Sequence, residues 1–309
     1  MKTAKYIWMD GSFLKWQDAN IHITSHTLHY GNGVFEGIRA YKTQNGLAVF
    51  KLKKHIKRLL DSAKITMINV PFSYEEIEKA IIELLEKNEF ENNTYIRPII
   101  YYSDGNLGIL PSECKSKLAI IAWEWSSPIE KDGLKKGIRA KISSFRRNSA
   151  NSTMSKAKAV SNYLNSQMSK QEALDCGYDV ALLLDDNGFV AEASGECFFM
   201  VRNKVLISPF NDNSLESITQ KAVIKLAKEM GIKVKRRNIT RDEIYICDEA
   251  FSTGTAAEIT PFYEIDNRII NNSESGKITK KLQKAYFDLV YGNSKKSNKY
   301  LTYISQKEK

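Results

Sequence analysis

The sequence predicts an α+β fold in two parts, and three observations support this. Asn45-Gly46 and Asn187-Gly188 each separate two short runs rich in β-forming residues, as in a tight hairpin. Apolar residues recur at the spacing of amphipathic helices after residue 51 and again after residue 217. An irregular segment from Glu124 to Lys136, with a proline and a glycine, lies between the two parts. A chain of 309 residues is long enough for two domains.

In the first half, strands are expected over 34–41 and 47–50, on either side of Asn45-Gly46. A helix is expected over 52–68, because its apolar residues form one stripe: Leu52, Ile56, Leu59, Leu60 and Ala63. Ser73-Tyr-Glu-Glu76 has the pattern of a capping box and predicts a second helix. The residues of that helix that should face inward are Ile77, Ile81, Leu84 and Leu85. The runs 94–102 and 118–123 are typical of buried strands.

In the second half, a helix is expected over 160–174, and strands over 180–184 and 189–193 should pair. Residues 197–201 and 204–208 predict another hairpin, and 218–230 predicts an amphipathic helix that ends at Gly231. We therefore expect a small N-terminal α/β domain over residues 1–125. An interdomain linker over 126–136 and a large C-terminal domain over 137–309 should follow.

Composition excludes several classes of protein. The chain is 42% hydrophobic and 27% charged, an ordinary globular balance. Its longest clean apolar run, 118–123, is far too short for a membrane span, and its N-terminus lacks the apolar core of a secretory signal. The four cysteines lie far apart without a CxxC pair, which argues against a disulfide scaffold or a zinc site. We expect a reduced, cytoplasmic protein of enzyme size.

The positive charge does not predict a nucleic-acid partner. Lys and Arg number 46 against 36 Asp and Glu, a formal net charge of +10. The excess is mostly lysine on helix faces such as 51–57, without interleaved aromatic residues. A solvated surface is therefore expected, with no nucleic-acid or membrane partner.

Two local patterns also have ordinary explanations. Gly31, Gly33 and Gly37 are spaced GxGxxxG, one residue too long for a dinucleotide fingerprint, and they lead into a strand instead of a helix. His22, His26 and His29 share a helical spacing, but no carboxylate or cysteine completes a metal site. We expect structural histidines and no metal.

Four segments become informative when they are taken together. They are His29-Tyr-Gly-Asn-Gly-Val-Phe-Glu-Gly-Ile-Arg39, Lys158-Ala-Val-Ser-Asn-Tyr163, Glu192-Ala-Ser-Gly-Glu-Cys-Phe-Phe199 and Ser252-Thr-Gly-Thr-Ala-Ala-Glu-Ile-Thr-Pro261. In this order and spacing the chain resembles the class IV, or fold-type IV, aminotransferases, and most closely the branched-chain amino acid aminotransferases. The resemblance runs from about Tyr6 to Val290. It implies a two-domain α+β fold with pyridoxal 5'-phosphate at the domain interface and residues 137–309 as the cofactor-binding domain.

The resemblance assigns the cofactor's reactive groups. Lys158 matches the Schiff-base lysine, whose amine must be neutral to act as a nucleophile; Lys156, two residues away, is its rival. Glu192 matches the carboxylate that pairs with the pyridine nitrogen and keeps it protonated. Glu196 competes with Glu192, because strand alternation would place both on one face. Tyr163 matches the tyrosine that hydrogen-bonds the phenolic oxygen.

The phosphate and the substrate have their own matched residues. For the phosphate they are Arg58, Thr255, and Ile218 and Thr219 at a helix start, where backbone N–H groups favour anions. Thr255 and Ala256 match the turn that holds the α-carboxylate. Those matching the side-chain pocket are Tyr30, Phe35, Gly37, Tyr95 and Trp125. Arg97 matches the arginine that receives the second carboxylate of glutamate or 2-oxoglutarate. The resemblance also places Leu107 and Ile109 in a neighbouring subunit's pocket, which implies a homodimer or an assembly of dimers.

Several positions depart from the family pattern. Cys197 stands where the motif has Asn, Ser217 replaces a Gly before Ile218, and Gln220 replaces an Arg. Val160-Ser161 replaces a Gly-Gly pair, and Pro128 replaces a tyrosine over the pocket. The sequence favours a branched-chain amino acid aminotransferase that uses 2-oxoglutarate. The alternatives are a D-amino acid aminotransferase, an aminodeoxychorismate lyase, a paralogue with another amino donor, or a non-catalytic descendant.

Overall fold

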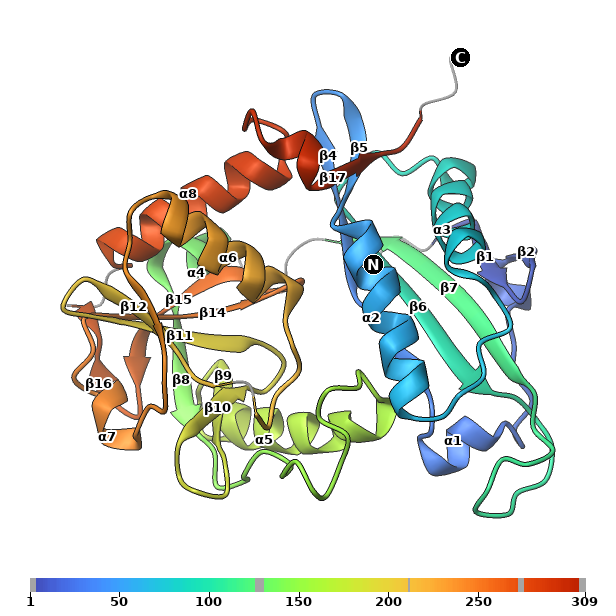
Figure 1. Cartoon of the computed structure of the whole chain (residues 1–309), viewed down its shortest axis with the longest axis horizontal. Helices are drawn as coiled ribbons and strands as arrows, with labels where there is room; N and C mark the ends of the chain where they lie inside the picture. The colour runs from blue at the N-terminus through green and yellow to red at the C-terminus, as the bar shows by residue number, and fades with distance from the viewer. Residues whose placement is uncertain (1–3, 126–130, 211, 272–274, 306–309) are drawn as a thin grey trace. The chain divides into compact units, whose positions relative to one another are not determined.

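The computed structural model describes residues 4–125, 131–210, 212–271 and 275–305 (Figure 1). The chain divides into two compact units. The first unit comprises residues 1–126, 157–161 and 289–309, and the second comprises 127–156 and 162–288. This division differs from the predicted boundary, because 157–161 and 289–309 belong to the first unit. Pro128 lies outside the described residues.

The first unit is built on an eight-stranded sheet of order β17-β5-β4-β6-β7-β1-β2, with β3 beside β6. Its strands are β1 (Tyr6–Met9), β2 (Ser12–Lys15), β3 (Val34–Phe35), β4 (Ile38–Thr43), β5 (Gly46–Phe50), β6 (Thr94–Tyr102), β7 (Ser116–Glu124) and β17 (Leu301–Tyr303). Its helices are η1 (Trp16–Asp18), α1 (His26–Tyr30), α2 (Leu52–Ile65), α3 (Tyr74–Asn88) and η4 (Ser297–Lys299). The C-terminal strand β17 joins this unit by pairing with β5.

Most sequence predictions for this unit are confirmed. The hairpin between β4 and β5 closes with Thr43 opposite Gly46, and Ser73 and Glu76 form the reciprocal capping box of α3. The predicted strand 34–41 is interrupted at Glu36 and Gly37, where the chain passes from β3 to β4. The predicted helix 52–68 ends at Ile65, because Met67 adopts a left-handed backbone conformation with φ +56°.

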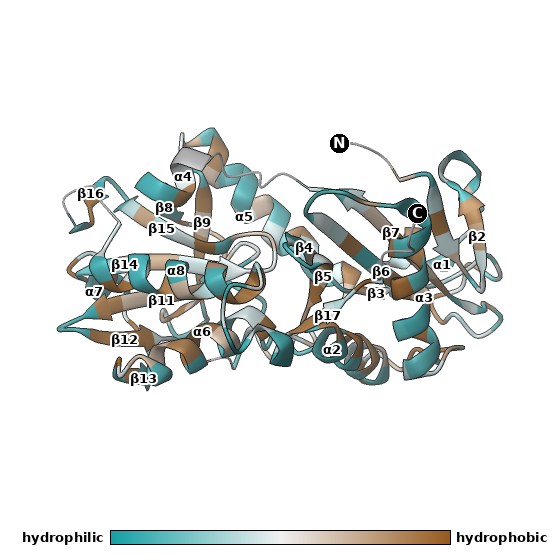
Figure 2. Cartoon of the chain, turned by 90° about the horizontal axis from the view of Figure 1, so that it is seen from above, coloured by the Kyte–Doolittle hydropathy of each residue, from teal (hydrophilic) through white to brown (hydrophobic). Residues whose placement is uncertain are grey.

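Strand alternation gives the sheet of the first unit two different faces. Apolar residues of one face, such as Ile96 and Ile100, form a core with α2 and α3, and Ala157 and Ala159 belong to the same core. The two helices carry both polar and apolar residues, as amphipathic helices on a sheet should (Figure 2). Residues 35, 95, 97 and 123 alternate with these core positions. They therefore belong to the opposite face.

The second unit is built on a nine-stranded sheet of order β10-β9-β8-β15-β14-β11-β12-β13, with β16 beside β15. Its strands are β8 (Ile138–Ile142), β9 (Val180–Leu184), β10 (Val190–Ala193), β11 (Cys197–Arg202), β12 (Val205–Ser208), β13 (Val234–Arg236), β14 (Glu249–Gly254), β15 (Glu258–Ile265) and β16 (Arg268–Ile269). Its helices are α4 (Lys131–Lys136), η2 (Val160–Asn162), α5 (Tyr163–Asp175), α6 (Ile218–Glu229), α7 (Arg241–Ile244) and α8 (Lys277–Val290), of which η2 and α8 begin or end in the first unit.

The hairpins and the amphipathic helix predicted here are also confirmed. β9 pairs with β10, β11 pairs with β12, and Gly231 follows α6 with φ +73°. The predicted helix 160–174 begins as a short 3₁₀ turn and becomes α-helical only at Tyr163. Part of the predicted linker, 131–136, is the helix α4.

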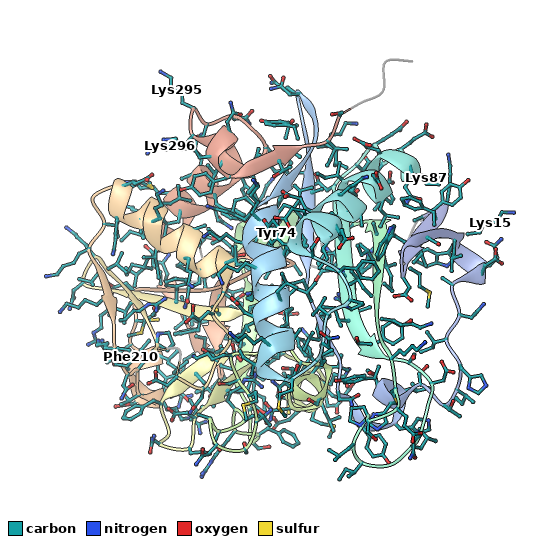
Figure 3. All side chains as sticks on the ribbon, turned by 45° about the vertical axis from the view of Figure 1, so that its right-hand side comes forward. Lys15, Tyr74, Lys87, Phe210, Lys295 and Lys296 are labelled. Atoms are coloured by element: carbon teal, nitrogen blue, oxygen red, sulfur yellow. The ribbon has the colours of Figure 1, made fainter. Side chains whose placement is uncertain are left out.

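The lysine excess lies on the surface, as expected. Lys15, Lys87, Lys295 and Lys296 are exposed and point outward (Figure 3). Among the helices of the described residues, none is long and apolar enough to cross a bilayer.

Candidate active site

Lys158 is held to the first unit by its backbone. Its carbonyl accepts a hydrogen bond from Phe35 N at 3.0 Å, and the next bond along, Val160 N to Gly33 O, is 2.8 Å. On its other side, Lys158 N donates to the hydroxyl of Ser62 in α2 at 3.0 Å. The lysine Nζ lies 4.8 Å from the centre of the Phe35 ring. The backbone carbonyl and the backbone N–H of Lys158 are therefore both held by hydrogen bonds, and its side chain lies over the Phe35 ring.

Arg58 forms a buried ion pair with Glu36 in the same unit. Its Nε and Nη2 donate to the two carboxylate oxygens at 2.5 and 2.9 Å, and His55 Nδ1 lies 2.7 Å from Glu36 Oε2. Burial alone would raise the pKa of Glu36, but the charges of Arg58 and His55 and their hydrogen bonds hold it well below its ordinary value. Burial lowers the pKa of His55 despite the neighbouring carboxylate. Glu36, which also contacts His55, thus orients the Arg58 guanidinium.

Aromatic and guanidinium groups gather on the sheet face opposite α2 and α3. The Arg97 guanidinium lies 4.6 Å from the Phe35 ring centre and 5.4 Å from that of Tyr95. Trp123 and Trp125 flank Tyr95, with ring centres at 5.0 and 5.1 Å. Within the described residues, the indole nitrogens of both tryptophans and Nε of Arg97 are buried without a hydrogen-bond partner. Buried donors of this kind are well suited to receive a ligand oxygen.

Gly37 lies directly against Tyr95. A Cβ atom at this position would lie 2.0 Å from the Tyr95 hydroxyl oxygen. No side chain larger than that of glycine fits there, and this close approach explains the third glycine of the GxGxxxG pattern.

Tyr30 belongs to a more exposed part of the first unit. It ends α1, its ring stacks on His26 at 4.5 Å, and its hydroxyl donates to Leu107 O at 2.7 Å. His26 Nε2 lies 2.7 Å from Gly108 O, so α1 and the loop around residue 108 are joined at two points. No histidine of this region is part of a metal cluster in the described chain.

In the second unit, Glu192 is paired with Arg147. The carboxylate and guanidinium lie 2.5 Å apart at Nε and are both nearly buried, and Arg147 Nη1 also donates to Asn165 Oδ1. We expected strand alternation to place Glu192 and Glu196 on one face, but β10 ends at Ala193 and does not include Glu196. Burial raises the pKa of Glu196. The two glutamates therefore differ: Glu192 lies in β10 and is ion-paired with Arg147, whereas Glu196 lies beyond the end of that strand.

The start of α6 keeps N–H donors available despite the change from glycine at 217. Ser217 is the N-cap, and its hydroxyl accepts from Gln220 N at 3.1 Å. Intrahelical hydrogen bonds cannot use the N–H groups of Ile218 and Thr219, which belong to the first turn. Gln220 is buried and its side-chain oxygen accepts from Arg236 at 3.1 Å. Arg236 thus brings a positive charge next to the position where the family pattern has arginine.

Thr255 and Ala256 form the turn between β14 and β15. Thr260 Oγ1 donates to Ala257 O at 2.7 Å, and Thr253 Oγ1 donates to Glu258 O at 2.5 Å. These two threonines brace the turn on both of its strands. Thr255 and Ala256 themselves are half-exposed.

The remaining predicted residues have these positions. Tyr163 is the first residue of α5 and is half-buried. Lys156, the rival of Lys158, is exposed and donates to Ser214 O at 3.1 Å in the second unit. Cys197 is buried in β11 opposite Thr253.

The pair Val160-Ser161 is accommodated by two glycines. A Cβ on Gly33 would lie 3.3 Å from Val160 Cγ2, and one on Gly31 would lie 3.4 Å from Ser161 Cβ. Side chains at 160 and 161 thus occupy space that Gly33 and Gly31 leave open. The lost Gly-Gly pair does not prevent the Lys158 segment from packing against β3.

Four residues around these groups were not predicted from the sequence: Glu36, His55, Ser62 and Arg147. Two of them left a signal. Glu36 is a lone charge within the apolar run 34–38, and Ser62 interrupts the apolar stripe of α2. A polar residue at a core position needs a partner, so both could have been marked as candidates.

The described geometry agrees with comparisons to known proteins. Residues 33–265 match the family model of amino-transferase class IV. The chain belongs to the class IV aminotransferases. One relative is the branched-chain-amino-acid aminotransferase of Pseudomonas aeruginosa, 44% identical over 96% of this chain and 97% of that protein.

The chain is also similar to solved structures of branched-chain amino acid aminotransferases. The T.th. branched-chain amino acid aminotransferase with pyridoxamine 5'-phosphate superimposes with a TM-score of 0.95, at 41% identity, over 99% of this chain and all of that one. Its complex with N-(5'-phosphopyridoxyl)-L-glutamate gives a TM-score of 0.94, at the same identity and coverage. The predicted fold-type IV, two-domain α+β architecture is thereby confirmed.

Proposed function

We propose that this chain is a pyridoxal-phosphate-dependent branched-chain amino acid aminotransferase. It would transfer the amino group between L-leucine, L-isoleucine or L-valine and 2-oxoglutarate. The main support is the fixed backbone of Lys158 beside Phe35 and α2, in a chain that aligns over nearly its whole length with branched-chain aminotransferases.

The donor set fits pyridoxal phosphate. Lys158 supplies the amine, and Arg58 supplies a guanidinium already oriented by Glu36. We assign the remaining phosphate contacts to Ile218, Thr219 and Thr255. Charge-assisted hydrogen bonds contribute about 1.5–3 kcal/mol each, whereas an exposed helix terminus contributes about 0.3–1 kcal/mol. Arg58 should therefore matter more to phosphate binding than the dipole of α6.

On the ring, we assign Glu192 to the pyridine nitrogen and Tyr163 to the phenolic oxygen. Bound pyridoxal phosphate supplies an aldehyde that condenses with amino groups and a ring that accepts electrons from the substrate Cα. The Glu192 carboxylate would hold a proton on the ring nitrogen, and Arg147 compensates its charge. The Lys158 amine, once replaced by the substrate amino group, would take the Cα proton and return it as general base and acid.

The substrate would be held by two kinds of group. Amides of Thr255 and Ala256 are assigned to the α-carboxylate. We assign the apolar side chain to Tyr30, Phe35, Gly37, Tyr95 and Trp125. Arg97 would receive the second carboxylate of glutamate or 2-oxoglutarate, and its buried, unpartnered Nε among the described residues supports this.

We also propose that the protein acts as a homodimer in the cytoplasm. Leu107 and Ile109 lie in an exposed loop, and Ile109 is 82% exposed in the single chain. Apolar side chains exposed to this extent on one loop are typical of an interface. The four cysteines are thiols, as expected in a reducing compartment.

The test is a panel of amino donors assayed with 2-oxoglutarate, alongside the visible spectrum of the protein. We expect L-leucine, L-isoleucine and L-valine to be converted and D-alanine to be inert. Preference for D-alanine, or lyase activity without amino transfer, would replace our proposal with another class IV reaction. A protein that stays colourless with pyridoxal phosphate would be a non-catalytic descendant.

A further inference from the structure

The hydroxyl of Ser62 joins two residues that the proposed function requires. Its oxygen donates to Arg58 O at 2.8 Å, one turn earlier in α2, and accepts from Lys158 N at 3.0 Å. Ser62 is fully buried, and Lys158 is 96 residues away in sequence. One hydroxyl thus connects the helix turn that carries Arg58 to the backbone of Lys158.

The hydrogen bond from Ser62 to the Arg58 carbonyl is of a kind that is common in helices. A serine hydroxyl often bonds the carbonyl four residues earlier in its own helix. The second bond is different, because it satisfies a backbone N–H from a separate segment. Without it, Lys158 N would lose this acceptor, and the segment would rely on the bond from Phe35 N to the Lys158 carbonyl and on that from Val160 N to Gly33 O.

We propose that Ser62 is a positioning residue that fixes the Lys158 amine relative to the Arg58 guanidinium. This rests on the proposed function. Pyridoxal phosphate carries its phosphate arm and its aldehyde on neighbouring ring atoms, so their separation is set by the cofactor. The protein must match it when the Lys158 nitrogen bonds to the aldehyde carbon and the aldehyde oxygen leaves as water. A displacement of about 1 Å can cost roughly 100-fold in such a reaction.

The chain offers a matched control in α5. Ser169 is also fully buried, and its hydroxyl donates to a carbonyl of its own helix, Ser166 O, at 3.1 Å. This bond stays within α5. Ser169→Ala therefore reports the loss of a buried helix serine, and Ser62→Ala reports this loss together with that of the contact to Lys158.

The experiment compares the binding of pyridoxal phosphate with that of pyridoxamine phosphate, which has no aldehyde. Both bind through the phosphate, but only the first forms a covalent bond with Lys158. The Arg58 carbonyl keeps its helical hydrogen bond in Ser62→Ala. We therefore expect this variant to bind pyridoxal phosphate about 10-fold more weakly, a size typical of one lost buried hydrogen bond, and pyridoxamine phosphate nearly as well as the unchanged protein. Ser169→Ala should leave both affinities unchanged.

An equal loss for both compounds, or no loss for either, would overturn the proposal. If Ser62→Ala does not fold, Ser62→Cys keeps a small, weakly polar atom at the site, and its ratio of the two affinities decides in the same way. Failure of the proposed function is distinguishable. If Lys158 does not carry the cofactor, the unchanged protein does not bind pyridoxal phosphate covalently, and if only the amino donor differs, the donor panel shows it while the comparison of the two affinities still applies.

Discussion

Arg58 and Glu36 form a two-point ion pair, with guanidinium Nε and Nη2 at 2.5 and 2.9 Å from the two oxygens of a fully buried carboxylate. A guanidinium held at two points cannot rotate away from its partner. The same carboxylate also pairs with His55, so a single residue of the segment between β3 and β4 orients two side chains of α2.

Glu36→Ala should destabilise the protein strongly, because it leaves Arg58 and His55 buried without their partner. Breaking a buried pair costs about 3–5 kcal/mol. Asp61→Ala is the control on the same helix: Asp61 is paired with Lys57 but exposed, and such pairs contribute at most about 0.5 kcal/mol. Denaturant unfolding of both variants measures the difference. Equal losses would show that the Glu36 network does not stabilise the fold.

The free energy of unfolding should decrease in two steps as the pH is lowered. The pKa of His55 is below its ordinary value of 6.5, so below pH 6.5 the unfolded chain takes up a proton that the folded protein does not. The pKa of Glu36 is below its ordinary value of 4.5, so its contribution is complete above pH 4.5 and is lost as the pH falls toward the folded pKa.

His55→Gln should remove the first of these steps, because glutamine donates to Glu36 without titrating. Between pH 7.5 and 5.5 we expect the unmodified protein to lose more of its unfolding free energy than the variant. Unfolding free energies at both pH values provide the measurement. His29→Gln, at an exposed position, should retain the full loss. An identical pH dependence in His55→Gln and the unmodified protein would contradict the assignment.

Gly37→Ala should displace Tyr95, whose hydroxyl oxygen would lie 2.0 Å from the new Cβ. Overpacking of this kind costs about 1–3 kcal/mol, and we expect the KM for L-leucine to rise as the proposed pocket changes shape. Adding Tyr95→Phe removes the closest atom and should restore stability in part, since Cζ would still be 2.9 Å away. A double variant no more stable than Gly37→Ala would argue against this contact.

Ile109→Glu should weaken the proposed dimer without unfolding the chain. Ile109 is 82% exposed in the single chain, and a charge there is harmful only if the residue becomes buried in an assembly. Met67→Glu is the control, at an 87% exposed position of the same unit. Light scattering after size exclusion gives the mass of each variant. An unchanged dimer in Ile109→Glu, or an equal effect of Met67→Glu, would place the interface elsewhere.

Local patterns predicted most helices and strands. The Thr43–Gly46 hairpin and the Ser73 capping box depend on neighbouring residues only, so the sequence was sufficient for both. The end of α2 at Ile65 was not predicted, because the left-handed conformation of Met67 has no glycine to signal it. Likewise, the place of the 157–161 segment in the first unit depends on hydrogen bonds to Gly33 and Phe35, far away in sequence.

Only part of the candidate site could be predicted from the sequence. The family motifs identified Lys158 and Arg58, whereas the contacts that fix them, from Ser62 and Glu36, became visible only in three dimensions. A single hydroxyl between two segments leaves little trace in the sequence, because serine is also ordinary on helix surfaces. The roles of the predicted site residues remain predictions.

Borohydride reduction after incubation with pyridoxal phosphate identifies the lysine that carries the cofactor. Peptide mass mapping should find the reduced adduct on Lys158, in the unmodified protein and in Lys156→Ala alike. Lys158→Ala should give no adduct and no amino transfer from L-leucine. An adduct on Lys156, or transfer activity retained in Lys158→Ala, would contradict the function proposed here.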